Sequence, residues 1–219
     1  MTLIKYPRTY HWPFSPEIHS DDKTLRQEHL ANFINQEVVI TEKLDGGNCC
    51  LTSDNVFARS HSGQASHPSF APIKALHATI KHQIPNGTFI FGENIYGVHT
   101  IKYEQFDAYL YVFAVSRHGM WLSYDAIVEE TNRLGLKTVP LLHRGVFQAT
   151  RVIQTWHDRE INQASTFGGV REGFVTRVAH SFKVPTFSQH VVKYVRQGHV
   201  QDDQRWEVNW QPANVQIQS

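Results

Sequence analysis

The feature that most constrains the fold is an apolar, β-branched run that leads into a charged segment and a pair of glycines. Residues 38–40 (Val-Val-Ile) favour a buried strand, and residues 41–48 continue as Thr-Glu-Lys-Leu-Asp-Gly-Gly-Asn. The strand would fix the side chain of Lys43, and Gly46 and Gly47 would let backbone or ligand approach closely. A nucleophilic lysine can be mounted in this way. Taken alone, however, a lysine before a turn is more often a solvated surface residue.

Hydrophobic spacing predicts strands and helices that do not alternate regularly. Strands are expected at 37–44, 88–93, 109–116, 171–177 and 187–195, with a hairpin over 48–59 and a short strand at 139–143. Helices are expected at 23–35, 71–82, 124–134 and 150–163. This order favours an α+β fold, built on antiparallel β-sheets with flanking helices, over a doubly wound sheet.

Length and composition indicate one globular domain over residues 1–219. An irregular arm (1–22) is expected to pack on the body, and a short tail (197–219) follows the last predicted strand. Neither an internal repeat nor a low-complexity linker divides the chain. Because the net charge is only +1, any contact with nucleic acid must come from a local patch.

Several classes of protein are excluded by pattern. The only cysteines, Cys49 and Cys50, are adjacent, so they cannot form the disulfide framework of a small secreted protein. A secretory leader and a run of membrane-spanning length are both missing from the sequence, which predicts a soluble, cytoplasmic protein without a membrane partner. A Walker phosphate loop and a His-Glu-x-x-His zinc motif are missing too.

Four charged residues lie at strand ends or junctions: Lys43, Glu93, Glu172 and Lys193. Glycine adjoins each carboxylate, and each lysine lies in otherwise apolar sequence. Charges embedded in core strands are costly unless they pair or bind a ligand. A buried salt-bridge network and a ligand site explain these residues about equally well at this point.

The order of short motifs resembles that of the covalent nucleotidyltransferases, the superfamily of polynucleotide ligases and messenger-RNA capping enzymes. The matching segments are 42–46 (Glu-Lys-Leu-Asp-Gly), 59–60 (Arg-Ser), 91–94 (Phe-Gly-Glu-Asn), 111–113 (Tyr-Val-Phe), 172–175 (Glu-Gly-Phe-Val) and 193–195 (Lys-Tyr-Val). One such motif is weak, but six in order are specific. Residues 92–99, with the strand that carries Phe113, look most similar to ATP-dependent RNA ligases.

That resemblance implies a nucleotidyltransferase (adenylation) domain in which Lys43 attacks the α-phosphate of ATP and forms a lysyl-AMP. The AMP would pass to a 5′-phosphate end, and a 3′-hydroxyl would then displace it. An amine must be neutral to attack, so the pKa of Lys43 has to fall below its ordinary value of about 10.4. Lys193 would contact the α-phosphate and, as a second cation, would help to lower that pKa.

The resemblance also implies a nucleotide site with a divalent metal, Mg²⁺ or Mn²⁺. Glu93 and Glu172 both suit the metal, with Glu93 favoured on the ribose and Glu172 on the metal side. Nucleotide binding would further involve Glu42, Asn48, Arg59 and Phe113. Glu42 is expected to read the adenine amino group, and Asn48 to reach the phosphate or metal region. Arg59 is expected to hold a ribose or phosphate oxygen, and Phe113 to stack on adenine.

Some positions depart from the superfamily pattern. Many relatives carry a second lysine where this chain has Val195, and Arg196 and Lys183 are the candidate substitutes. Asp45 matches DNA ligases and capping enzymes, whereas some RNA ligases have histidine there. The residues after 195 leave no room for a C-terminal oligonucleotide-binding (OB) barrel, so none is expected.

The leading interpretation is an ATP-dependent RNA ligase that acts on RNA ends, with a role such as RNA repair. The alternatives are a DNA or RNA/DNA nick-sealing ligase, a capping guanylyltransferase, and a catalytically silent nucleotide- or nucleic-acid-binding module. A silent module is disfavoured because all four charged residues are retained. The sequence leaves open whether the substrate is nicked or single-stranded, and it leaves the oligomeric state open too.

Overall fold

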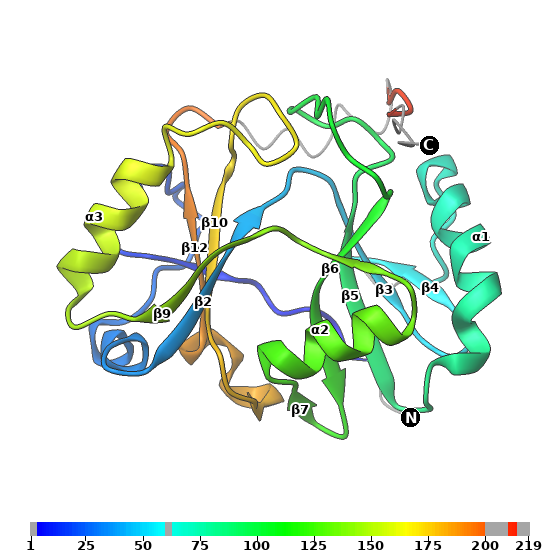
Figure 1. Ribbon diagram of the computed structural model, residues 1–219, viewed down its shortest axis with the longest axis horizontal. Helices are drawn as coiled ribbons and strands as arrows, with labels where there is room; N and C mark the ends of the chain where they lie inside the picture. The colour runs from blue at the N-terminus through cyan, green and yellow to red at the C-terminus, as the bar shows by residue number, and fades with distance from the viewer. Residues whose placement is uncertain (1–3, 60–62, 200–209, 214–219) are drawn as a thin grey trace.

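A computed structural model describes residues 4–59, 63–199 and 210–213 of the chain. Its strands form two sheets that stand side by side, as the two groups of arrows in Figure 1 show. Ser60 of the second motif and most of the predicted tail lie outside the described residues. Within the described part of the chain, no helix is long and apolar enough to cross a membrane.

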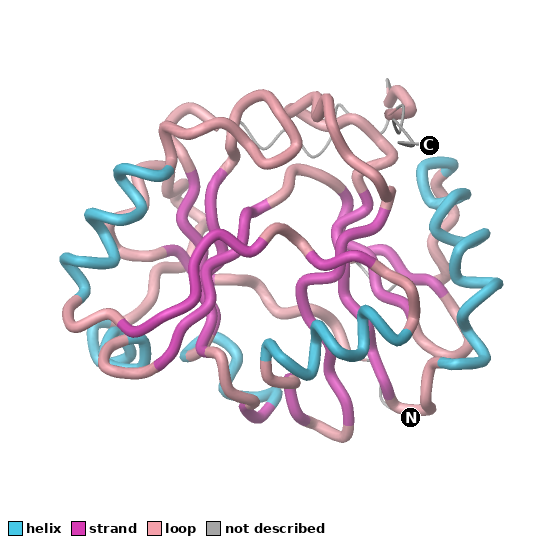
Figure 2. The backbone as a smooth tube through the Cα atoms, viewed as in Figure 1, coloured by secondary structure: helices cyan, strands magenta, loops and turns pink. Residues whose placement is uncertain are grey.

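The first sheet has five strands. In spatial order they are β1 (Tyr10–His11), β12 (Val191–Val195), β10 (Gly173–Val178), β2 (Glu37–Lys43) and β9 (Leu141–Val146). Only the β1–β12 pairing is parallel among these strands. Helix α3 (Thr150–Glu160) covers the outer side of this sheet (Figure 2), and a 3₁₀ segment, η1 (Gln27–Phe33), precedes β2.

The second sheet carries the other half of the fold. Its order is β11 (Phe182–Lys183), β7 (Met120–Trp121), β6 (Leu110–Arg117), β5 (Thr88–Asn94), β3 (Gly47–Leu51) and β4 (Val56–Ala58), and β8 (Lys137–Thr138) pairs with β6. Helix α1 (Ala71–Ile80) lies on its outer flank, and α2 (Tyr124–Arg133) crosses below (Figure 1). Three further 3₁₀ segments are Pro68–Phe70, Lys81–Gln83 and Val184–Gln189.

Close backbone packing requires glycine where the motifs place it. Gly173, the first residue of β10, pairs with Lys43 on one side and Val195 on the other. A Cβ at Gly173 would lie 2.0 Å from the carbonyl oxygen of Tyr194. A Cβ at Gly46, in the link from β2 to β3, would lie 2.6 Å from the carbonyl oxygen of Asn94. Both glycines therefore let the motif segments approach their neighbours.

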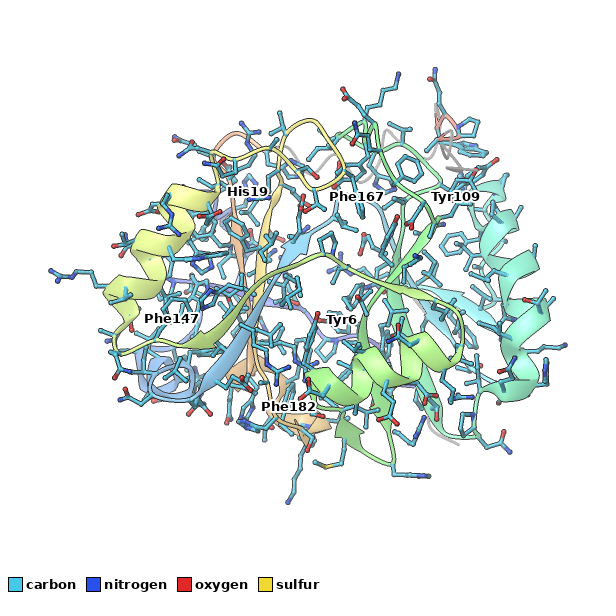
Figure 3. All side chains as sticks on the ribbon, viewed as in Figure 1. Tyr6, His19, Tyr109, Phe147, Phe167 and Phe182 are labelled. Atoms are coloured by element: carbon cyan, nitrogen blue, oxygen red, sulfur yellow. The ribbon has the colours of Figure 1, made fainter. Side chains whose placement is uncertain are left out.

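The N-terminal arm packs on the body of the fold. Trp12 is fully buried in the hydrophobic core, and its indole N–H donates to Thr176 Oγ1 of β10 at 3.3 Å. Tyr6 lies between the two groups of strands in Figure 3. Its ring contacts that of Phe113 at 4.9 Å and that of Phe187 at 4.9 Å, so the arm contacts both halves of the fold.

The predicted α+β class with antiparallel sheets is confirmed, and most predicted elements appear within a few residues of their expected bounds. Two expectations were wrong. Within residues 23–35 only the 3₁₀ segment η1 (Gln27–Phe33) forms instead of the expected α-helix, because only Phe33 of that segment is buried and no broad apolar face supports a longer helix. The expected strand over 187–195 starts only at Val191, after the 3₁₀ segment opened by Pro185.

Candidate active site

A cavity of about 1280 Å³ opens between the two sheets. Each residue proposed from the sequence for catalysis, nucleotide or metal lines it: Glu42, Lys43, Asn48, Arg59, Glu93, Phe113, Glu172 and Lys193. The first sheet supplies the lysines and Glu172, and the second supplies Asn48, Glu93 and Phe113. The fold thus brings together residues that are up to 151 positions apart in the sequence (193 − 42). The volume is ample for a nucleotide.

Lys43 and Glu172 form the central ion pair of the cavity. Lys43 ends β2, and its Nζ donates a hydrogen bond to Glu172 Oε1. Glu172 directly precedes Gly173, the register partner of Lys43, so the pairing of β2 with β10 brings the backbones of Lys43 and Glu172 close together. The side chain of Glu172 is 1% exposed and that of Lys43 is 21% exposed. The carboxylate is therefore buried, while the ammonium group remains reachable from the cavity.

The pairing sets the protonation of both groups. Burial alone would lower the pKa of Lys43, but the carboxylates of Glu172 and Glu93 outweigh it and raise that pKa. Burial would raise the pKa of Glu172, but the charge of Lys43 and the neighbouring His199 hold it below its ordinary value. The unliganded protein therefore keeps Lys43 as an ammonium ion. This is the opposite of the lowered pKa that nucleophilic attack requires.

Glu93 and Asn48 face each other across neighbouring strands of the second sheet. Asn48 of β3 is the register partner of Glu93 of β5. Asn48 Oδ1 is buried and accepts no hydrogen bond within the described residues. Burial raises the pKa of Glu93 to about 8, since the nearby Lys43 only partly offsets it and the Glu172 charge adds to it. Asn48 therefore offers an unused acceptor to a ligand, next to the carboxyl group of Glu93.

Lys193 lies on β12 and faces the arm. Its Nζ is 3.6 Å from Asp22 Oδ1, and the two side chains are 12% and 10% exposed. Burial, aided by the charge of Lys43, lowers the pKa of Lys193 although Asp22 opposes the change. Asp22 had no signal in the sequence, because a single aspartate in an irregular arm is indistinguishable from a surface residue.

Glu42 is held in place by contacts with the segment between α3 and β10. Its Oε2 accepts the Thr166 N–H at 3.0 Å and lies 3.7 Å from Arg171 Nε. Its other oxygen, Oε1, is buried without a hydrogen-bond partner in the described part of the chain. Glu42 is 1% exposed, so an acceptor is held in place at the cavity wall.

Phe113 and Arg59 complete the set named from the sequence. Phe113 is half-buried on β6, and its ring and that of Tyr6 form a T-shaped pair. Arg59 follows β4 and is exposed, and its charge acts on Glu93 across the cavity. An aromatic ring and a guanidinium group thus border the same space as the two lysines.

A cluster of Asp45, Glu172 and His199 could hold a divalent cation. One ligand atom from each lies within 4.8 Å of the others. Glu172 Oε2 is buried and has no hydrogen-bond partner among the described residues. Asp45 is positioned by the backbone N–H groups of Thr100 and Ile101, which donate to its Oδ2 at 2.8 and 2.6 Å. The two carboxylates are ligands of the type that Mg²⁺ and Mn²⁺ prefer, whereas the imidazole is more typical of ions such as Zn²⁺.

A family model described as RNA ligase matches residues 36–195. The chain belongs to the RNA ligase family. That match runs from β2 to the end of β12, so it contains Lys43, Glu93, Glu172 and Lys193. A comparison with curated proteins by sequence finds no match.

Solved structures with a similar fold include an RNA ligase from Naegleria gruberi. A variant of that enzyme with ATP and Mn superposes with a TM-score of 0.58 at 16% identity, covering 77% of this chain and 52% of that one. The same ligase with PPi gives 0.58 at 16% identity, with 89% and 61% covered. A putative ATP-dependent DNA ligase from Aquifex aeolicus gives 0.55 at 19% identity, with 88% and 50% covered. This chain therefore spans about half to three-fifths of the length of these ligases.

The candidate substitutes for the second family lysine lie elsewhere. Lys183 is exposed on β11, and Arg196 borders a separate cavity of about 630 Å³ beside α3. Within the described residues, neither side chain lines the cavity that contains Lys43.

Sequence reasoning also missed His199. It is 5% exposed, and its Nε2 lies 3.3 Å from Glu172 Oε1. Its contact with Glu172 depends on the path of the chain after β12, which no sequence pattern indicates. The predicted absence of an OB barrel stays a prediction.

Proposed function

We propose that this chain is the nucleotidyltransferase domain of an ATP-dependent RNA ligase, which joins 5′-phosphate and 3′-hydroxyl ends through a lysyl-AMP. The observation that carries the proposal is the Lys43–Glu172 pair at the wall of a nucleotide-sized cavity that also contains Lys193, Glu93 and Phe113. The family match covers all of these residues.

In the first step Lys43 Nζ, once deprotonated, forms a bond to the α-phosphorus of ATP. The bond from that phosphorus to the bridging oxygen breaks, and pyrophosphate leaves. Glu172 must stop acting as the hydrogen-bond partner of an ammonium ion before this attack, because the pair keeps Lys43 protonated. Lys193 is the cation positioned to stabilise negative charge that develops on the phosphate.

A divalent cation would be held by Glu172, together with Glu93 or the neighbouring Asp45 and His199. When bound, it would supply positive charge to phosphate oxygens. A cation held by Glu172 would also compete with Lys43 for that carboxylate, which removes the main support for the ammonium form.

Three side chains suit the nucleoside. The half-buried ring of Phe113 offers a face or edge for adenine, and the unpartnered Oε1 of Glu42 can accept from the adenine amino group. Asn48 and Arg59 have donors for ribose or phosphate oxygens.

In the second step an oxygen of the RNA 5′-phosphate attacks the phosphorus of the lysyl-AMP, and the lysine amine is the leaving group. In the third, the 3′-hydroxyl attacks the activated 5′-phosphate and expels AMP. Both steps need positioning and charge neutralisation more than a strong base.

The deciding experiment is incubation with α-labelled ATP and Mg²⁺, followed by denaturation and detection of covalent label. Label is expected on the wild type, lost in Lys43→Ala and strongly reduced in Glu172→Gln. Lys137→Ala is the matched control, because Lys137 is an exposed lysine paired with Asp107 outside the cavity. Absence of label with ATP, on protein shown beforehand to carry no AMP, would overturn the proposal.

A nick-sealing DNA ligase is the second candidate, favoured by the structural likeness to the Aquifex aeolicus protein. Sealing assays with matched single-stranded RNA, nicked RNA and nicked DNA decide between the two. Joining of DNA nicks at a rate equal to or above that of RNA ends would replace RNA with DNA as the proposed substrate.

A further inference from the structure

The Asp22 carboxylate is surrounded by positive charge and N–H donors where the arm meets the cavity. Lys193 Nζ lies 3.6 Å from it, His11 Nε2 3.2 Å and one Arg8 guanidinium nitrogen 3.4 Å. The backbone N–H of His19 also donates to it, at 3.1 Å. Groups from the arm and from β12 thus converge on a single anion.

His11 is built into this arrangement rather than being a surface contact. Its side chain is 2% exposed, and its Nδ1 lies 3.2 Å from Ser15 Oγ. Ser15 is itself held by the Val195 N–H at 3.0 Å. His11 Nε2 forms no hydrogen bond within the described residues, and Asp22 is the polar group that it faces. A buried imidazole nitrogen is therefore aimed at the position of the carboxylate.

The carboxylate that these groups surround belongs to an irregular part of the arm rather than to a strand. Asp21 and Asp22 follow a turn in which the Asp22 N–H donates to the His19 carbonyl. The side chain of Asp21 is 76% exposed and that of Arg8 41% exposed. His19, Asp21 and Asp22 all line the cavity. His11 and Lys193 are held on β1 and β12, whereas Arg8 and Asp22 lie in irregular parts of the arm.

We propose that Arg8, His11 and Lys193 form a phosphate-binding subsite, and that Asp22 occupies it until a substrate phosphate takes its place. The inference rests on the proposed function for the identity of the substrate, since the phosphate belongs either to the β,γ-phosphates of ATP or to the 5′ end of an RNA strand. The shared chemistry is a phosphate oxyanion, which offers more acceptor oxygens than the single carboxylate.

Asp22 then competes with the substrate phosphate inside the same molecule. Converting its carboxylate to an amide keeps the shape of the side chain and removes the competing charge. Arg8→Gln removes one of the cationic partners without touching Lys43 or Lys193. Asp21→Asn changes net charge by the same amount as Asp22→Asn, but Asp21 pairs with Arg8 alone among the described residues.

The test is calorimetric titration of the full chain with inorganic pyrophosphate, and separately with a 5′-phosphorylated RNA oligonucleotide and its 5′-hydroxyl counterpart. Asp22→Asn is expected to bind the phosphate ligand about tenfold more tightly than wild type, and Arg8→Gln several-fold more weakly. Asp21→Asn is expected to change affinity by less than about threefold. Thermal unfolding of each variant is the control for loss of the fold.

The two ligand series distinguish the sources of phosphate. A gain for pyrophosphate alone assigns the subsite to the polyphosphate of ATP. A gain for the 5′-phosphorylated RNA alone, absent with the 5′-hydroxyl strand, assigns it to the RNA end. Equal binding of every ligand by wild type and Asp22→Asn overturns the subsite. Because this readout needs no lysyl-AMP, it stands or falls separately from the labelling experiment.

Discussion

Lys43, the last residue of β2, donates a hydrogen bond to Glu172, the residue that directly precedes β10, and the neighbouring Gly173 is packed too closely to carry a side chain. The residue proposed as nucleophile is therefore held, in the unliganded protein, by the carboxylate proposed to bind the metal. Substrate binding has to separate the two before the lysine can react.

The first prediction concerns the titration of Lys43. In the wild type the carboxylates raise the pKa of Lys43, so it should titrate above the ordinary value of about 10.4. In Glu172→Gln the largest of these charges is gone and burial dominates, so the pKa should fall. The pH dependence of amine labelling, followed by mass spectrometry at Lys43, measures it. Lys137 serves as the internal reference, and an unchanged Lys43 profile in Glu172→Gln would contradict the assignment.

The second prediction concerns adenine binding by Phe113. Phe113→Leu should weaken ATP binding about tenfold, because stacking of an aromatic ring contributes on the order of 1–1.5 kcal/mol. Phe113→Trp should retain most of the affinity, since the ring face is kept. Equilibrium titration with ATP measures both. If the leucine variant binds like wild type, Phe113 does not stack on the base.

The third prediction tests the tight crossing at Gly173. Gly173→Ala should destabilise the fold by about 3 kcal/mol, because the new Cβ would fall 2.0 Å from the Tyr194 carbonyl oxygen and the strands must shift. Gly63→Ala is the control, since a Cβ there meets nothing within 4 Å. Denaturant unfolding of both variants gives the difference, and equal stabilities would show that β10 and β12 yield easily.

The fourth prediction is a loss of stability in mild acid that depends on His157. This residue is fully buried, with Nδ1 2.8 Å from the Ile153 carbonyl oxygen, and burial lowers its pKa to about 4. Between about pH 6.5 and 4 the unfolded chain binds a proton that the folded chain does not. The free energy of unfolding should therefore fall by ~3 kcal/mol as pH drops through this window, at about 1.4 kcal/mol per unit.

The test for His157 compares how steeply the free energy of unfolding changes with pH, and not the free energy itself. His157→Asn should reduce the dependence of unfolding free energy on pH in that window, whatever it costs at pH 7. The exposed His82 offers the matched variant, His82→Asn, which should leave the slope as in wild type. Identical slopes in all three proteins would show that His157 is protonated in the fold.

Sequence patterns predicted the strands that carry the site, because β-branched runs and glycines mark their ends. The run 38–40 located β2, and the strand expected over 171–177 overlaps β10 with a start two residues too early. Motif order then indicated which charged residues share a cavity. The pattern could not locate Asp22 or His199, since their contacts with Lys193 and Glu172 are made by irregular segments with no periodicity. The protonation states of Lys43 and Glu172 could not be predicted from the sequence either, because they depend on the distances between charged groups in the fold.

The division of the cavity between two sheets has a mechanical consequence. Lys43 is the last residue of β2 and Glu172 directly precedes β10 of the same sheet, so the two are expected to move together, whereas Glu93 belongs to the second sheet. The covalent link from β2 to β3 is only residues 44–46, pressed against Asn94 at Gly46. A rotation of one sheet against the other would therefore leave the ion pair intact and change its separation from Glu93. A nucleotide bound as proposed would contact both sheets, so its length would set the distance between Lys43 and Glu93.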